Sequence, residues 1–167
     1  MPIFRSSRSP RALAAVCLAA AAVACRELPF EPEDPTTVTY APALGVTLSA
    51  YTPLPSGVYY QDVAVGSGAV VTDSSTVTVS YRGRLADGRE FDATDPGQTI
   101  PFNLRNTIAG WRSGLAGARA GGRRRLIIPP SQGYGNRTTE NNRIPAGSVL
   151  VFDVNLTSVI TPIDTTS

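Results

Sequence analysis

Alternation of hydrophobic and polar positions predicts several β-strands between residues 57 and 159. The clearest alternation covers residues 75–85, where Val77, Val79 and Tyr81 share one face and polar residues the other, as in a half-buried strand. Residues 58–63 predict an earlier strand that ends at a glycine-rich turn. Residues 122–128 and 148–159 predict the last two long strands, and Asp87-Gly88 predicts a turn into residues 90–92.

One short helix is predicted at residues 107–115. Ile108, Trp111 and Leu115 recur there at helical spacing, and glycines at 117, 121 and 122 end the segment. The pattern therefore predicts an α+β fold, a twisted antiparallel sheet of about five strands wrapped around one short helix. We expect this domain to span residues 57–160 and to be followed by a C-terminal tail, residues 161–167.

The first 25 residues have the pattern of a cleavable export signal. Arg5, Arg8 and Arg11 precede an apolar run of residues 12–24, which is too short to span a bilayer. Ala22-Val23-Ala24-Cys25 is similar to a bacterial lipobox, which implies removal of residues 1–24 and lipid attachment to Cys25. The residue after the cysteine is arginine rather than aspartate, which favours the outer membrane. An ordinary signal-peptidase site at the same junction would instead give a soluble periplasmic or secreted protein.

The segment between the signal and the domain divides into two parts. Residues 25–42 are rich in proline and acidic residues, so we expect an extended tether that buries little apolar surface. Residues 43–56 form an N-terminal extension. Leu44, Val46 and Leu48 alternate there with Gly45 and Thr47, which indicates a possible edge strand.

Composition removes several classes of function. The basic residues are all arginines, 15 against 13 acidic residues, but three lie in the signal, so the mature chain is close to neutral. The chain has no histidine, and both cysteines lie in or just after the signal, so we expect neither disulfide, thiolate nucleophile nor zinc site in the folded part. Arg123-Arg124-Arg125 would point alternately to opposite faces of a strand, so we expect a solvated strand face and no nucleic-acid binding.

Six aromatic residues are spaced so that a small sheet could gather them around one apolar hole. They are Tyr81, Phe91, Phe102, Trp111, Tyr134 and Phe152. Their contexts are VTVSYRG (77–83), GREFDAT (88–94), IPFNL (100–104), TIAGWRSGL (107–115), PPSQGYG (129–135) and IPAGSVLVFDV (144–154). In order and spacing these segments resemble the FKBP-type peptidyl-prolyl cis–trans isomerases, from about Gly57 to Val159.

The resemblance implies a fold, a reaction and a site. The reaction is rotation about X–Pro bonds in proline-containing polypeptides, without cofactor or metal, and macrolides are possible inhibitors. Trp111 would form the pocket floor. The walls would be Tyr81, Phe102, Ile108 and Phe152, with Thr107 beside them. Phe91 and Asp92 would flank one side, and Tyr134 and Ile144 would come from loops above. Asp92, Tyr134 and Phe91 are the expected catalytic residues: the Tyr134 hydroxyl and the Ile108 N–H would hydrogen-bond the substrate, and the Asp92 carboxylate would order neighbouring polar groups.

Alternatives remain at this stage. The same groove could hold proline-containing segments without catalysis, as a chaperone module, or the domain could belong to a structural envelope lipoprotein that only shares the fold. The alternative for Asp92 is a turn-stabilising aspartate, and for Trp111 a plain core tryptophan. If the isomerase interpretation holds, the protein would assist folding in the periplasm or cell envelope and contact the membrane only through its lipid.

Overall fold

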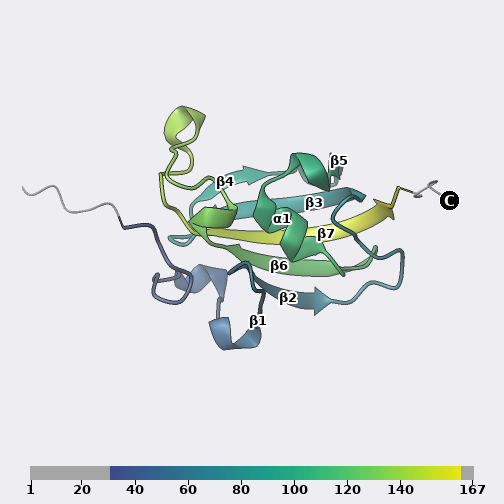
Figure 1. Cartoon of the computed structure of the whole chain (residues 1–167), viewed down its shortest axis with the longest axis horizontal. Helices are drawn as coiled ribbons and strands as arrows, with labels where there is room; N and C mark the ends of the chain where they lie inside the picture. The colour runs from purple at the N-terminus through teal and green to yellow at the C-terminus, as the bar shows by residue number, and fades with distance from the viewer. Residues whose placement is uncertain (1–30, 163–167) are drawn as a thin grey trace, which may run out of the picture.

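The computed structural model describes residues 31–162, which form one twisted antiparallel sheet with a short helix across it (Figure 1). The strands are β1 (Thr52–Pro53), β2 (Tyr59–Ala64), β3 (Thr76–Leu85), β4 (Glu90–Ala93), β5 (Ile100–Asn103), β6 (Arg123–Ile128) and β7 (Leu150–Ile160). The helix is α1 (Ala109–Leu115), and five single-turn 3₁₀ helices are η1 (Pro42–Leu44), η2 (Leu48–Ala50), η3 (Leu104–Asn106), η4 (Pro130–Gln132) and η5 (Glu140–Asn142). The strand order is β1-β2-β6-β7-β3-β4, and β5 pairs with β3 beyond this path.

The α+β fold is confirmed, with seven strands rather than the five expected. The two additional strands are short and lie at sheet edges: β1 has two residues, and β5 pairs only with β3. Neither alternates clearly between apolar and polar residues, and each contains a proline, which is tolerated in edge strands. The long pairing of β3 with β7, from Thr76–Ile160 to Leu85–Leu150, forms the centre of the sheet.

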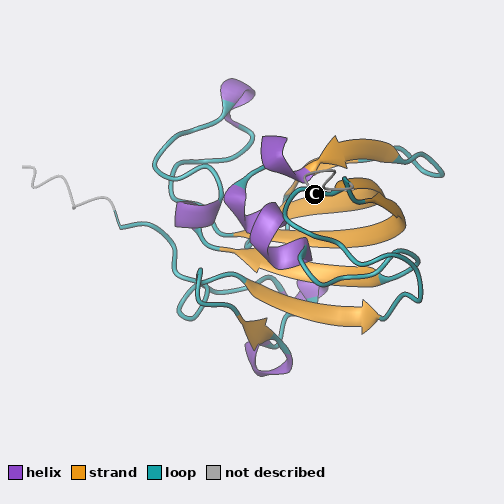
Figure 2. Ribbon diagram, turned by 45° about the vertical axis from the view of Figure 1, so that its right-hand side comes forward, coloured by secondary structure: helices purple, strands orange, loops and turns teal. Residues whose placement is uncertain are grey.

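The longest helix within residues 31–162, α1, packs across one face of the sheet (Figure 2), and two of its glycines leave room for the side chains of β6. A Cβ atom added to Gly110 would overlap the Ile128 side chain, and one added to Gly114 would lie 2.8 Å from Leu126 Cδ2. Gly110 and Gly114 are one turn apart and so share the face that meets β6. A seven-residue helix with two glycines has little intrinsic stability, so packing against the sheet holds it in place.

Residues 33–51 cover part of the opposite face of the sheet. Val38 and Tyr40 pack on a small second core around Tyr51, Ile127 and Val149. The Val149 N–H donates to the carboxylate of Glu33 over 2.6 Å, and the Glu33 N–H donates to the Gly147 carbonyl over 2.8 Å.

The N-terminal segment therefore differs from the expected tether over residues 33–42, because its few apolar side chains find a sheet face to bury against. Residues 43–56 do contain an edge strand, but it is the two-residue β1 beside β2 and not the alternating segment from Leu44 to Leu48. They form η1, η2 and the two-residue β1, and Gly45 ends η1 in a left-handed conformation, with φ 57°.

Arg124 is buried, which corrects the expectation of a solvated face for Arg123-Arg124-Arg125. Its side chain is 5% exposed and pairs with Asp62 through two hydrogen bonds of 2.7 and 2.8 Å. The guanidinium also donates to the carbonyls of Gly114 and Ala116, each over 3.0 Å, and lies 4.3 Å from the centre of the Tyr60 ring. Carbonyls at a helix C-terminus lack partners within the helix, so Arg124 fastens the end of α1 to β2 and β6.

Within residues 31–162, no helix combines the length and apolarity needed to cross a bilayer. The predicted signal, the lipid-attachment residue Cys25 and most of the predicted C-terminal tail lie outside the described residues.

Candidate active site

A pocket of about 330 Å³ opens between α1 and the sheet face on which it packs. All but one of the predicted site residues line it, together with Asn106. The lining residues are Tyr81, Phe91, Asp92, Phe102, Asn106, Thr107, Ile108, Trp111, Tyr134 and Phe152. They come from β3, β4, β5, β7, η3, the start of α1 and the loop after η4, so the pocket exists only when the sheet and helix are assembled.

The Trp111 indole forms the floor, as expected. Its side chain is 4% exposed, and three rings meet it edge to face: Tyr81 at 5.3 Å, Phe102 at 5.4 Å and Phe152 at 5.3 Å between centroids. Edge-to-face pairs at these distances are a favourable arrangement of aromatic rings. The indole N–H is buried without a hydrogen-bond partner among the described residues.

The wall beside the floor packs over Gly83 of β3, whose lack of a side chain leaves room for two aromatic rings. Phe91 and Phe152 meet edge to face at 5.5 Å, directly over Gly83 of β3. A Cβ atom on Gly83 would lie 2.6 Å from Phe91 Cζ and 2.8 Å from Phe152 Cε1. Glycine at this position therefore makes the space in which the two rings stand.

Two tyrosine hydroxyls provide polar groups at the rim. The Tyr81 hydroxyl donates to Asp92 Oδ2 over 2.6 Å, a short bond to a carboxylate. Burial, and then the bond to Asp92, raise the pKa of Tyr81 far above its usual value. Burial, with Asp92 adding to it, also raises the pKa of Tyr134. Both hydroxyls are therefore neutral hydrogen-bond donors through the physiological pH range.

Two donors in the pocket are free to bind a ligand. The Tyr134 side chain is 40% exposed, and its hydroxyl bonds to none of the described residues. The Ile108 carbonyl accepts from the N–H of Trp111 over 3.0 Å, whereas the Ile108 N–H has no backbone partner within residues 31–162. Thr107 differs, because its hydroxyl already donates to the Leu104 carbonyl over 2.8 Å.

Ile144 lies outside the pocket. It is 4% exposed and belongs to the main core, where its N–H donates to Thr139 Oγ1 over 3.0 Å. The neighbouring Arg143 reaches the site instead: its guanidinium donates to the Phe91 carbonyl over 3.2 Å and ties the loop to β4. Sequence reasoning missed this link and the pocket position of Asn106, which its place directly before Thr107 could have suggested.

The pocket composition favours binding of a small apolar ring over acid–base or metal chemistry. Six aromatic side chains and Ile108 provide its apolar surface, and the polar groups are neutral donors and one carboxylate. Among residues 31–162, no three His, Cys, Asp or Glu side chains gather as metal ligands would.

Comparison with known proteins shows the family of the chain. Residues 68–157 match the family model described as FKBP-type peptidyl-prolyl cis-trans isomerase. The chain belongs to this family. The FKBP resemblance and the FKBP-like fold predicted from the sequence are thereby confirmed.

Two curated relatives illustrate the similarity. FKBP-type peptidyl-prolyl cis-trans isomerase FkpA of Escherichia coli (strain K12) is 43% identical over 105 residues, which are 62% of this chain and 38% of FkpA. FK506-binding protein 4 of Chaetomium thermophilum is 39% identical over 122 residues, 71% of this chain and 23% of the relative. The chain thus spans less than half the length of these relatives.

Solved structures of FKBP-type proteins share the fold. The crystal structure of FkpA from Escherichia coli has a TM-score of 0.62 and 40% identity, covering 66% of this chain and 51% of FkpA. A peptidyl-prolyl cis-trans isomerase from Pseudomonas syringae pv. tomato has a TM-score of 0.62 and 32% identity, covering 67% of this chain and 82% of that chain.

Proposed function

We propose that this protein is a peptidyl-prolyl cis–trans isomerase that accepts prolyl rings in the aromatic pocket. The observation that carries the proposal is the pocket itself, in which three rings stand on the Trp111 indole while the Tyr134 hydroxyl and the Ile108 N–H are free to donate. Its substrates would be proline-containing unfolded or partly folded polypeptides. Membership of an isomerase family supports the same reaction.

A dry aromatic pocket can accelerate this rotation without forming any covalent bond. Twisting the X–Pro amide removes the resonance that makes its barrier about 18–20 kcal/mol, and the twisted amide is less dipolar than the planar one. Water therefore stabilises the planar ground state more than the twisted transition state. A site that grips the prolyl ring away from water and leaves the preceding segment free to rotate reverses this preference.

The required energy is within reach of weak interactions. An acceleration of roughly 10⁴ to 10⁶ corresponds to about 5–8 kcal/mol of differential stabilisation. Hydrogen bonds from Tyr134 and Ile108 would contribute about 0.5–1.5 kcal/mol each, with desolvation of the amide supplying the rest. Asp92 contributes by fixing the Tyr81 hydroxyl, and hence the ring that stands on Trp111. Asp92, Tyr134 and Phe91, the residues expected from the sequence to be catalytic, remain proposed catalytic residues, and Phe91 would act through its ring, which packs on Phe152 in the pocket wall.

The alternative is a module that holds proline-containing segments without isomerising them. Both functions require the pocket, so binding alone does not separate them. Faster cis–trans exchange in a short X–Pro peptide supports catalysis, whereas peptide binding with unchanged exchange supports the holding module.

We predict that the macrolide FK506, for which some relatives are named, changes the fluorescence of Trp111. The ligand would cover the indole, and Trp111 is the only tryptophan in the chain, so the emission reports on the pocket floor alone. Titration followed by both fluorescence and calorimetry measures this. Saturable heat with unchanged emission would show that the macrolide binds elsewhere.

We further propose that the protein is exported and anchored to the outer membrane through lipid on Cys25. It would face the periplasm and assist folding of periplasmic and envelope proteins there. The support is the pattern of basic residues, apolar run and lipobox-like sequence in residues 1–25. Two or more acyl chains anchor a protein stably, whereas a single chain does so only marginally. Since Glu33 is fastened to the domain, the chain from Cys25 to Glu33 spans at most roughly 28 Å, so the domain would lie close to the membrane.

Replacement of Cys25 by serine is expected to move the protein from the membrane fraction to the soluble fraction with its isomerase activity unchanged. Cell fractionation, together with mass spectrometry of the N-terminal peptide, measures both effects. A wild-type protein that is already soluble, or an unmodified Cys25, would replace the anchor with ordinary secretion.

A further inference from the structure

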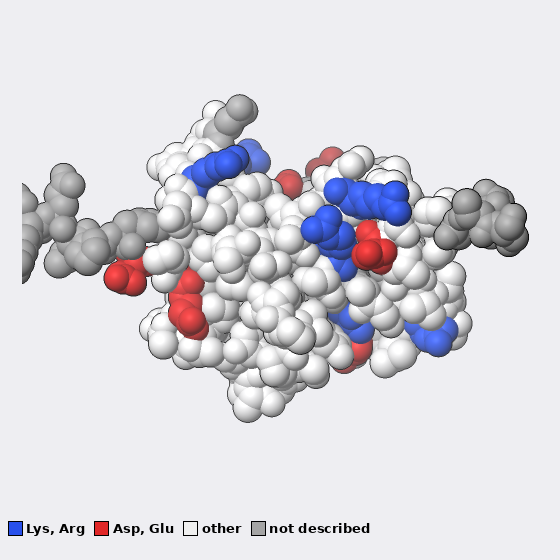
Figure 3. Space-filling model, viewed as in Figure 1, with Lys and Arg blue, Asp and Glu red and all other residues white. Residues whose placement is uncertain are grey.

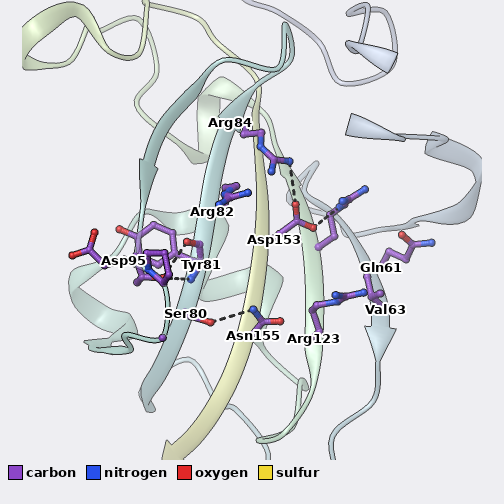
Figure 4. A pocket seen from close by; sticks show the side chains of 14 residues that line it. Gln61, Val63, Ser80, Tyr81, Arg82, Arg84, Asp95, Arg123, Asp153 and Asn155 are labelled. Carbon is purple, nitrogen blue, oxygen red and sulfur yellow. Dashed lines mark hydrogen bonds and ion pairs between the residues drawn. The ribbon is translucent and has the colours of Figure 1, made fainter. Parts of the chain in front are cut away.

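A second, larger concavity of about 520 Å³ lies on the outer face of the sheet, opposite α1 (Figure 4). Residues 33–51 cover the apolar part of this face, and the groove occupies the part they leave open. Its floor is formed by outward-facing side chains of β2, β6, β7 and β3, and the turn at Asp95, Pro96 and Gly97 forms one rim. Of the residues that line the groove, Tyr81 alone also lines the prolyl pocket.

The groove is lined by four arginines and two aspartates. Arg125 Nε lies 2.7 Å from Asp153 Oδ1, and Arg84 Nη1 lies 3.6 Å from Asp153 Oδ2, so two guanidinium groups share one carboxylate. Arg82 pairs at 2.9 Å with Glu90. Arg123 is exposed and has no ion pair or side-chain hydrogen bond within residues 31–162. Positive charge is therefore left over at Arg123 and at the Arg84–Arg125 pair, opposed only by Asp95 on the rim.

The geometry of these cations suits carboxylate groups. An arginine presents a planar fork that can bind a carboxylate through two parallel hydrogen bonds. Arg125 already donates through Nε to Asp153 and through Nη1 to the Leu44 carbonyl over 2.8 Å, so Arg84 and Arg123 are the arginines that would bind a ligand carboxylate. Beside Arg123, Asn155 donates to Ser80 Oγ over 3.1 Å and keeps its own side-chain oxygen free for a backbone N–H of a ligand.

The groove is joined to the prolyl pocket around the edge strand β4. A notch of about 410 Å³ shares Phe91 and Asp92 with the prolyl pocket and shares Arg82 and Asp95 with the groove. The path around one strand, from one face of the sheet to the other, is about 15 Å, which about five extended residues can cover. One polypeptide can therefore reach both concavities.

We propose that the groove binds an acidic stretch of the polypeptide whose proline occupies the aromatic pocket. This inference rests on the proposed isomerase function and adds a substrate preference: client segments with glutamate or aspartate about five residues from the proline. The excess of positive charge in the groove favours an acidic ligand. Because the notch joins the groove to the prolyl pocket, we expect this ligand to be part of the same polypeptide as the proline rather than a separate molecule.

The test compares three fluorescein-labelled peptides with a central Ala-Leu-Pro-Phe. A glycine-serine spacer of two residues precedes this motif and one of three residues follows it, and beyond each spacer stand three Glu, three Gln or three Lys. The first variable residue on either side is then five residues from the proline. Affinity is measured by anisotropy and exchange by NMR, with protein purified from cells expressing the full chain. The Glu peptide is expected to bind about fivefold more tightly than the Gln peptide at low salt, the sum of two exposed ion pairs, and the Lys peptide more weakly. At about 0.5 M salt the difference should vanish.

Variants of opposite sign locate the effect. The double variant Arg84→Gln/Arg123→Gln should abolish the preference for Glu, and Asp95→Asn should increase it, because Asp95 is the rim carboxylate. Arg89→Gln/Arg112→Gln is the charge-matched control for the double variant, since both arginines are exposed and neither lines the groove. None of these changes should alter binding of the Gln peptide.

Equal affinity for all three peptides, or a Glu preference that survives Arg84→Gln/Arg123→Gln, would overturn the proposal. Single-stranded DNA and unlabelled Glu peptide are also compared as competitors of the labelled Glu peptide. If DNA displaces it at the lower concentration, the groove prefers nucleic acid, and the proposal of a polypeptide ligand is wrong. Absence of accelerated exchange with every peptide would refute the isomerase function alone, and anisotropy would still decide the groove.

Discussion

Arg124→Leu is expected to lower the free energy of unfolding by about 3 kcal/mol, because it leaves Asp62 and two helix-terminal carbonyls without their partner. The guanidinium is 5% exposed, so water cannot fully replace it. Its loss also removes the cation–π contact with Tyr60. Because Arg124 ties the end of α1 to the sheet, the pocket floor on this helix should loosen as well. Chemical denaturation followed by circular dichroism measures the change.

The adjacent residue provides a matched control. Arg123→Gln removes an exposed arginine from the same strand and should change stability by no more than about 0.5 kcal/mol. The double variant Arg124→Leu/Asp62→Leu should recover part of the lost free energy of unfolding, because it also removes the carboxylate that Arg124→Leu leaves unpaired. If Arg124→Leu unfolds at the same denaturant concentration as the wild type, the buried network does not stabilise the fold.

Asp92→Leu is expected to lower kcat/KM about tenfold on an uncharged peptide while the melting temperature stays near that of the wild type. Asp92 is exposed, so its loss costs little stability, but it holds the hydroxyl of Tyr81, whose ring stands on Trp111. The tenfold loss corresponds to about 1.4 kcal/mol of transition-state stabilisation, which the carboxylate would supply by holding the Tyr81 ring in place on the pocket floor.

A mutant cycle distinguishes how Asp92 acts. If the carboxylate works through Tyr81, the variant Asp92→Leu/Tyr81→Phe should be no less active than Asp92→Leu alone. Asp95→Asn, three residues away on the rim of the outer groove, should leave activity on the same peptide unchanged. Full activity in Asp92→Leu would remove Asp92 from the site, and an unfolded variant would show that its role is structural.

The alternation of β3 and the spacing of the helix could be read directly from the sequence. Val77, Val79 and Tyr81 face the core side as predicted, and Ile108, Trp111 and Leu115 lie on the face of the short helix that meets the sheet and pocket. The aromatic pocket was anticipated because a twisted sheet brings together residues far apart in the chain. The family resemblance supplied the roles of individual side chains, which alternation alone does not give.

Other features required three-dimensional contacts. Composition predicts an extended tether over residues 25–42, but within it Val38 and Tyr40 supply enough apolar surface to pack on the sheet. Arg124 is buried because the strand turns alternate side chains inward, and Asp62, distant in sequence, then neutralises it. Ile144 packs in the core rather than in the pocket, and its N–H donates to Thr139 Oγ1, a loop contact that alternation does not predict.

The most direct test of the central claim is NMR magnetisation exchange between the cis and trans forms of one Ala-Leu-Pro-Phe peptide, with the protein at substoichiometric concentration between pH 6 and 9. Without catalysis, exchange takes tens to hundreds of seconds. The account predicts much faster exchange at a rate that does not change across this pH range, because burial raises the pKa of Tyr81 and Tyr134 and the chain has no histidine. Exchange as slow as in the peptide alone would contradict the isomerase function, and a bell-shaped pH profile would contradict catalysis without acid–base chemistry.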